Sequence, residues 1–143
     1  MTGVCFNAEK RGWQQDQWSW LFSNFGITDV WMRGRDAQTQ DIYQDTIDIE
    51  SAADLPMDHK VIVLSPPDAR FVKGNTSLID FEHPEKAIYL FGASFGVISD
   101  DDLGGRRPDA TVFIPTFKHE LFAHNAGYIA LYDRLVKRGG AHG

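Results

Sequence analysis

The chain has 143 residues, 43% of them apolar and 24% charged, a balance that predicts one folded domain over residues 1–143 and excludes a disordered chain. Lys and Arg total 14 against 20 Asp and Glu, so the net charge of −6 excludes nucleic-acid binding through a generally basic surface. The single cysteine, Cys5, excludes an intramolecular disulfide. No apolar run approaches the roughly 20 residues of a membrane span and no signal peptide is visible, so we expect a cytoplasmic protein without membrane contact.

The N-terminal third of the chain predicts a strand, a helix and a second strand. Residues 4–6 form a short apolar run that predicts a strand, and residues 29–32 predict a second strand. Between them, apolar side chains fall on one face of a helix at Trp18, Leu21, Phe22 and Phe25. Gly26 suits the end of that helix. Two strands joined by a helix within about 30 residues favour a parallel pair with a right-handed crossover.

Further apolar runs predict the rest of the same sheet. Residues 60–65 and 87–91 hold continuous apolar runs, as in parallel strands that are covered on both faces. Residues 110–114 predict the last strand, and residues 46–50 alternate in polarity, which predicts a short edge strand. The alternation of strands and helices predicts an α/β fold with a parallel sheet of about five or six strands.

Two helices are predicted in the C-terminal third. Ser99 can cap a helix that carries Asp102 at its third position and further acidic residues in its first turn. The second helix, over residues 121–138, is apolar on two sides, which is more than one sheet face can cover. We therefore expect a homodimer that uses the first and last helices. Its contacts would include Trp18, Leu131 and Leu135.

The loops that follow three of the strands are the expected ligand site, because open parallel sheets bind ligands beyond the carboxyl ends of their strands. These loops span residues 64–68, 92–96 and 115–120. In the last loop, Glu120 or a neutral His119 is a candidate general base that removes a proton from a hydroxyl group. His119 and His124 would lie about 140° apart around a helix, so no metal site is predicted there.

The sequence at these strands and loops, taken in order, resembles the SpoU (TrmH-type) family of the SPOUT superfamily of RNA methyltransferases. Residues 89–99 resemble the strand that leads into the family's Gly-x-Glu-x-x-Gly-Leu-Ser, and residues 110–116 resemble its strand into Ile-Pro-Met. Residues 121–133 resemble the helix that follows. A weaker similarity places Asn7 and residues 24–30 at the N-terminal motif of the family.

The resemblance implies a Rossmann-like parallel sheet whose C-terminal segment is tied in a trefoil knot, in a homodimer. It implies S-adenosylmethionine as the cofactor and the methylation of ribose 2′-hydroxyls in tRNA as the activity. On the same resemblance, the cofactor site would be formed by Leu64, Leu90, Phe91, Gly92, Gly96, Ile114, Pro115 and Leu121. An ordinary place in the hydrophobic core is the alternative interpretation for Leu64, Leu90, Ile114 and Leu121.

Several polar side chains of the family's motifs are replaced in this chain. Trp20 stands where the family has an Arg on the first helix, and Ser94 stands at the Glu of the second motif. Glu120 and Phe122 stand at the Ser and Asn of the third motif. These departures support a second hypothesis, a knotted homodimer that binds S-adenosylmethionine or RNA without methylating it. An unrelated α/β enzyme with similar glycine-rich turns is the third.

RNA binding on this acidic chain requires a local group of basic side chains. Lys10, Arg11, Arg33 and Arg35 lie near the ends of the first predicted elements, beside the expected cleft. Such side chains can contact RNA phosphates, and the alternative is ordinary solubilising charge.

Overall fold

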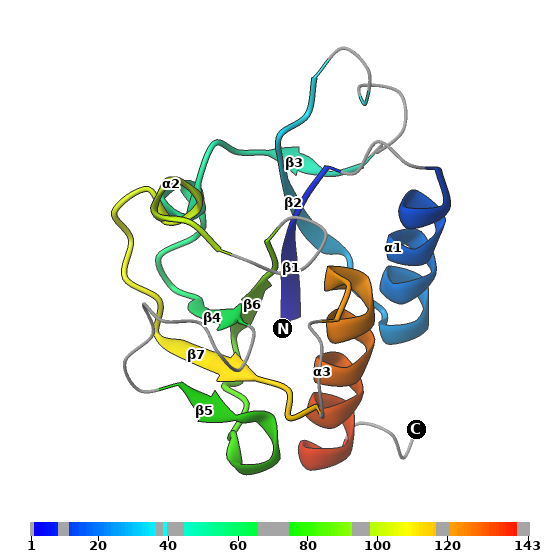
Figure 1. Cartoon of the computed structure of the whole chain (residues 1–143), viewed down its shortest axis with the longest axis vertical. Coiled ribbons are helices and arrows are strands. Elements are labelled where there is room, and N and C mark those ends of the chain that lie inside the picture. Colours follow the sequence, from blue (N-terminus) through cyan, green and yellow to red (C-terminus); the bar gives the residue numbers. More distant parts are fainter. Residues whose placement is uncertain are drawn as a thin grey trace.

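The computed structural model describes residues 2–8, 12–36, 39, 45–65, 75–92, 98–116 and 121–139, and only the backbone of residues 12–15. Within these residues, seven strands form one parallel sheet in the order β3-β2-β1-β6-β4-β7-β5 (Figure 1). The strands are β1 (Thr2–Asn7), β2 (Asp29–Arg33), β3 (Ile47–Asp48), β4 (Lys60–Leu64), β5 (Thr76–Ser77), β6 (Ala87–Leu90) and β7 (Ala110–Phe113). The predicted α/β fold with a parallel sheet is confirmed.

Helices cover both faces of the sheet. The long helices α1 (Gly12–Phe25) and α3 (Ala123–Lys137) run side by side on one face (Figure 1). The short helix α2 (Asp100–Leu103) and the 3-10 turn η1 (Ala52–Asp54) lie on the other face, and a second turn, η2 (Leu78–Asp80), precedes β6. The close approach of α1 and α3 depends on Gly127, where an added Cβ would lie 2.7 Å from Leu21 Cδ1.

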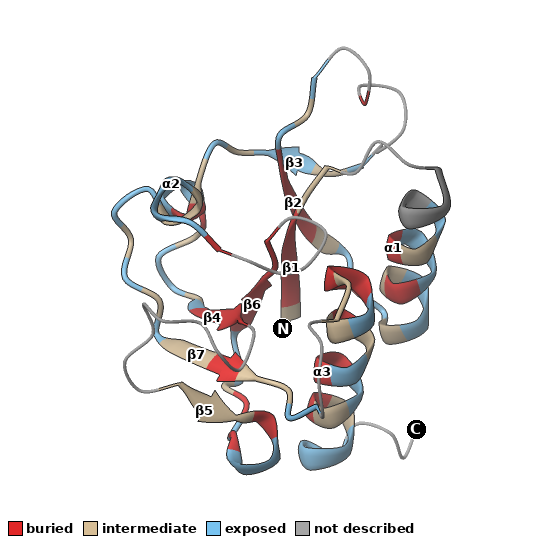
Figure 2. Cartoon of the chain, viewed as in Figure 1, coloured by how far each residue is buried: buried red, intermediate tan, exposed pale blue. Residues whose placement is uncertain are grey.

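The alternation of side chains along the strands divides the core into two layers. Successive residues of β1 show the division, since Val4 and Phe6 pack under α1 and α3 while Cys5 packs toward α2 and η1. The central strands are therefore buried on both faces, as the red ribbons of Figure 2 show. This arrangement explains why the sequence of these strands is continuously apolar rather than alternating.

Two expectations about the elements change in the folded chain. Strand β5 was not predicted, because Thr76 and Ser77 form no apolar run and pair with β7 at the edge of the sheet. The side chains of Trp18 and Leu131, expected in a dimer interface, are 1% and 2% exposed and belong to the core of the single chain. The trefoil knot stays a prediction, since the described residues do not show it directly.

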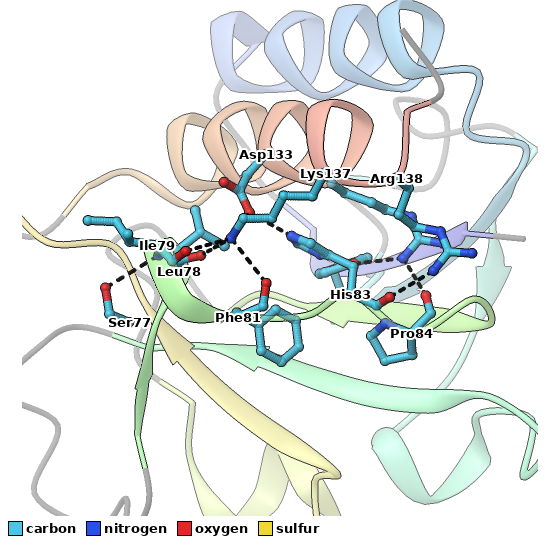
Figure 3. A network of polar contacts seen from close by, with 11 residues as sticks. Ser77, Leu78, Ile79, Phe81, His83, Pro84, Asp133, Lys137 and Arg138 are labelled. Atoms are coloured by element: carbon cyan, nitrogen blue, oxygen red, sulfur yellow. Dashed lines mark hydrogen bonds and ion pairs between the residues drawn. The ribbon is translucent and has the colours of Figure 1, made fainter.

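A polar network fastens α3 to the segment between η2 and β6 (Figure 3). Lys137 Nζ donates to the carbonyl oxygens of Leu78, Ile79 and Phe81 at 2.6–3.0 Å. Arg134 donates to the carbonyls of Pro84 and Glu85, and Arg138 donates to that of His83. Cationic side chains in the last turns of a helix also suit its dipole, so these residues serve both roles.

The imidazole of His83 is the buried centre of this network. Its Nε2 lies 2.7 Å from Asp133 Oδ2, and its Nδ1 lies 2.6 Å from the hydroxyl of Tyr89. That hydroxyl also accepts from Arg134 Nη1 at 3.0 Å. A neutral ring that donates from Nε2 and accepts at Nδ1 satisfies every one of these contacts. Burial lowers the pKa of His83, against the raising effect of Asp133, which agrees with a neutral ring.

Candidate cofactor and RNA site

The carboxyl ends of three neighbouring strands meet at one edge of the sheet. Strand β4 lies between β6 and β7, with Val63 opposite Leu90 and Leu64 opposite Val112. The loops expected to hold a ligand follow these same three strands. The structure therefore brings together segments of the chain that are far apart in the sequence, at the place where open parallel sheets bind their ligands.

The predicted cofactor residues at this edge differ in what they can offer a ligand. The side chains of Leu64, Leu90 and Phe91 are buried, and Phe91 packs edge-on against Trp18 with ring centroids 5.4 Å apart. Leu64 and Leu90 thus take the place in the core that was the alternative interpretation. A ligand could meet only their backbone.

Three other predicted residues are accessible enough to present apolar surface to a ligand. Ile114, which is half-buried, and Pro115, which is exposed, directly follow β7, whereas Leu121, also half-buried, lies two residues before the start of α3. Gly92, two residues past the end of β6, is buried and carries no side chain. A glycine backbone and accessible apolar side chains are features with which proteins approach the apolar faces of small ligands.

Several predicted site residues lie outside the described residues. They are Lys10, Arg11, Gly96, His119 and Glu120, together with Ser94 of the second motif. Their roles stay predictions.

The two remaining candidates for RNA contact occupy different environments. Arg35 is partly exposed, and its guanidinium binds Asp48 through Nε at 2.7 Å and the hydroxyl of Thr46 through Nη2. Arg33 is only 5% exposed and binds Asp102 and Asn7 through its two Nη atoms. The guanidinium of Arg33 is therefore turned to protein partners and leaves no free face for a phosphate. Arg35 remains a candidate for RNA contact.

Two of the positions at which the motifs depart from the SpoU pattern, Trp20 and Phe122, belong to the described residues. Trp20, at the place of the family's Arg, is 57% exposed on α1. Phe122 is half-buried and stacks on His124, with ring centroids 5.7 Å apart.

Burial lowers the pKa of His124, so its ring is neutral at pH 7. Among the described residues, no group of three or more His, Cys, Asp or Glu side chains could hold a metal ion.

An apolar groove of about 660 Å³ adjoins this edge of the sheet and runs along α3. Ile114 and Pro115 line it on one side, and Phe25 of α1 contributes at one end. Its most exposed apolar side chains are Ile79, Ile129, Tyr132 and Val136. The sequence predicts apolar surface on two sides of this helix, with Ile129 and Val136 on one side and Tyr132 on the other, but it does not show which side packs against α1.

Comparison with known proteins gives a consistent result for the fold. No family model matches the sequence, and no curated protein matches it. A solved structure that concerns 2-OH methylation of C/U34 on tRNA is similar over 98% of this chain and 92% of its own, with a TM-score of 0.71 and 18% identity. The TrmH/SpoU tRNA modifying enzyme of A. aeolicus is similar over 98% of this chain and 76% of its own, with a TM-score of 0.71 and 11% identity.

A third structure adds a ligand to the comparison. The SpoU methyltransferase AviRb from Streptomyces viridochromogenes, in complex with AdoMet, is similar over 96% of this chain and 60% of its own, with a TM-score of 0.69 and 17% identity. At these identities the similarity establishes the fold. The chain therefore has the fold of SpoU/TrmH-type methyltransferases, and the resemblance drawn from its motifs is confirmed at that level.

Proposed function

We propose that the chain is an S-adenosylmethionine-dependent RNA methyltransferase that acts on a ribose 2′-hydroxyl of tRNA. The proposal rests on the positions of Gly92 and Ile114-Pro115. They follow β6 and β7, the two strands that lie on either side of β4. These are the segments that resemble the family's second and third motifs. The fold is shared with structures of tRNA-modifying and AdoMet-binding proteins, which supports the same assignment.

The residues at this edge would act mainly by positioning. When bound, S-adenosylmethionine supplies a methyl group whose bond to sulfur breaks as its bond to the ribose oxygen forms. Ile114, Pro115 and Leu121 would cover the apolar surface of the cofactor, and the backbone at Gly92 would approach it closely. Holding two reacting groups in line is a large source of rate enhancement. Glu120 and His119 remain the candidates that accept the hydroxyl proton.

The apolar groove along α3 supports the homodimer that the sequence predicts. Ile79 is 71% exposed and Tyr132 is 60% exposed, and both face one continuous apolar hollow. Monomeric proteins rarely leave a large apolar patch uncovered. A second copy of the chain would cover this groove, and Ile114 and Pro115 would then lie beside both the cofactor and the partner.

The rival proposal is a knotted homodimer that binds the cofactor or RNA without transferring a methyl group. The specific observation that favours it is the replacement of the family's Arg by Trp20, an exposed apolar side chain.

Among the described residues no helix is long and apolar enough to cross a membrane. The cytoplasmic location stays a prediction that suits either protein.

Turnover with labelled cofactor separates the two proposals. The protein is incubated with methyl-labelled S-adenosylmethionine and total tRNA, and the labelled nucleotide is mapped. Incorporation at a ribose oxygen supports methylation, and binding of S-adenosylhomocysteine without incorporation supports the rival. Binding of neither ligand at millimolar concentration refutes the cofactor site.

Two matched variants test the location of the cofactor. Ile114→Ala should weaken S-adenosylhomocysteine binding about fivefold, because it removes apolar contact worth about 1 kcal/mol. Ile49→Ala is the control, since Ile49 is also half-buried but packs on the opposite face of the sheet. Equal affinities of the two variants would place the cofactor elsewhere.

A further inference from the structure

Arg33 is a buried cation at the point where three elements meet. It is the last residue of β2, and its partner in the sheet register is Asn7, the last residue of β1. One Nη atom donates to the side-chain oxygen of Asn7 and the other to Oδ1 of Asp102, in α2. The side chain of Arg33 is 7% exposed and that of Asp102 is 15% exposed. A charge this far from water has to be paired, so the contact with Asp102 is required rather than incidental.

Asp102 divides its two carboxylate oxygens between two tasks. Oδ2 accepts from the backbone amide of Ser99 at 2.8 Å and completes the capping box of α2. Oδ1 accepts from Arg33. The first turn of α2 is thereby attached to the end of β2, a residue 69 positions away in the sequence. A cap alone would use only one of these oxygens.

The segment that ends at this contact is the one expected to approach the cofactor. The amide of Phe91 donates to the carbonyl of Cys5 at 2.9 Å, which holds the chain at the end of β6 to β1. On the other side of the expected loop over residues 92–96, Ile98 is buried against the core and Asp102 is bound by Arg33. Both flanks of the loop are therefore anchored to the first two strands, one by the sheet and one by a buried ion pair.

We propose that Arg33 is a positioning residue for the cofactor site, which it serves by binding Asn7 and Asp102 together and so holding the flank 98–102 against the ends of β1 and β2. This inference rests on the proposed function for the identity of the ligand. The Nε of Arg33 is buried and has no hydrogen-bond partner among the described residues. Lysine cannot replace this residue, because a single ammonium group cannot span the two partners of a planar guanidinium.

The test compares two variants of the pair with two matched controls. Arg33→Lys keeps the positive charge but cannot contact Asn7 and Asp102 at the same time. Asp102→Asn keeps the side-chain volume and an oxygen that can accept from the amide of Ser99, but it loses the negative charge. Asp101→Asn makes the same change on an exposed neighbour in α2. Arg134→Lys changes another buried arginine, 8% exposed, whose contacts are in the network of α3. All four are measured for thermal stability, S-adenosylhomocysteine affinity by calorimetry and hydrogen exchange of residues 98–103.

Arg33→Lys and Asp102→Asn should each bind S-adenosylhomocysteine about tenfold more weakly and exchange faster at residues 98–103, because the flank 98–102 must then be ordered on binding. The two control variants should bind within about twofold of the wild type. Unchanged affinity in folded Arg33→Lys and Asp102→Asn overturns the inference and leaves Arg33 a purely structural residue. Failure of the wild type to bind refutes the proposed function instead. If the wild type binds and the two variants exchange at residues 98–103 as slowly as it does, only the role of Arg33 is refuted.

Discussion

Substitution of Tyr89 by phenylalanine removes one hydroxyl from the centre of the buried network under α3. The side chain of Tyr89 is 1% exposed, so water does not replace the lost group. The hydroxyl joins His83 Nδ1 at 2.6 Å to Arg134 Nη1 at 3.0 Å. After the substitution, Arg134 keeps its contacts with the carbonyls of Pro84 and Glu85. His83 Nδ1 is left as a buried acceptor without a donor.

One orphaned buried acceptor costs about 2 kcal/mol of the free energy of unfolding. For a chain of 143 residues, the entropy of unfolding is about 0.3 kcal/mol/K near the midpoint. The melting temperature should therefore fall by about 6–7 °C. Since the ring itself is retained, no large cavity adds to this loss.

Equilibrium unfolding in urea and calorimetric melting measure the effect. Tyr128→Phe is the control, because the hydroxyl of Tyr128 accepts from Asn24 at 3.1 Å in an exposed position where water can replace the bond. Its loss should stay below about 0.5 kcal/mol. A similarly small loss in Tyr89→Phe, with an unchanged urea dependence, would refute the idea that this hydroxyl satisfies His83.

Three further predictions concern pH, assembly and RNA. Burial lowers the pKa of His83 below its ordinary 6.5, so the free energy of unfolding should fall as the pH drops through that lowered pKa. His83→Gln should flatten this pH dependence in urea titrations, and the same pH dependence in the variant and the wild type would contradict the prediction. Ile129→Asp, in the apolar groove, should convert a dimer of twice 16.1 kDa into a monomer in sedimentation at tens of micromolar, and a wild-type monomer would reject the interface. Arg35→Ala should lower the salt slope of tRNA binding by about one unit with the cofactor affinity unchanged, whereas an unaltered slope would make Arg35 ordinary surface charge.

The elements of the fold follow from local patterns in the sequence. Continuous apolar runs predict β4 and β6, and their burial on both faces is the reason for the pattern. The predicted cap at Ser99 is confirmed in detail, with the hydroxyl accepting from the amide of Asp102. Gly26 ends α1 with a φ of +64°, as its sequence position suggested. Each of these features depends on residues within about one turn of each other.

The candidate site was predicted only in part. The loops after β4, β6 and β7 were expected at one edge, because parallel strands align their carboxyl ends, and the strand order confirms that these three strands are neighbours. The sequence could not tell which apolar residues at those ends face the core. Leu90 and Ile114 are both aliphatic, yet Leu90 is fully buried between layers and Ile114 is half-buried at the groove.

The role of Arg33 shows what only the tertiary structure decided. As a residue in the sequence it is one of a pair of arginines around a glycine, and solvent exposure was the natural expectation. In the folded chain it lies against Asn7 and Asp102, which are distant in the sequence. The same holds for His83, whose partner Asp133 lies 50 positions away in α3. Hydrophobic periodicity and capping are local and therefore readable from the sequence, whereas the burial and pairing of a charged side chain depend on which distant segment packs over it.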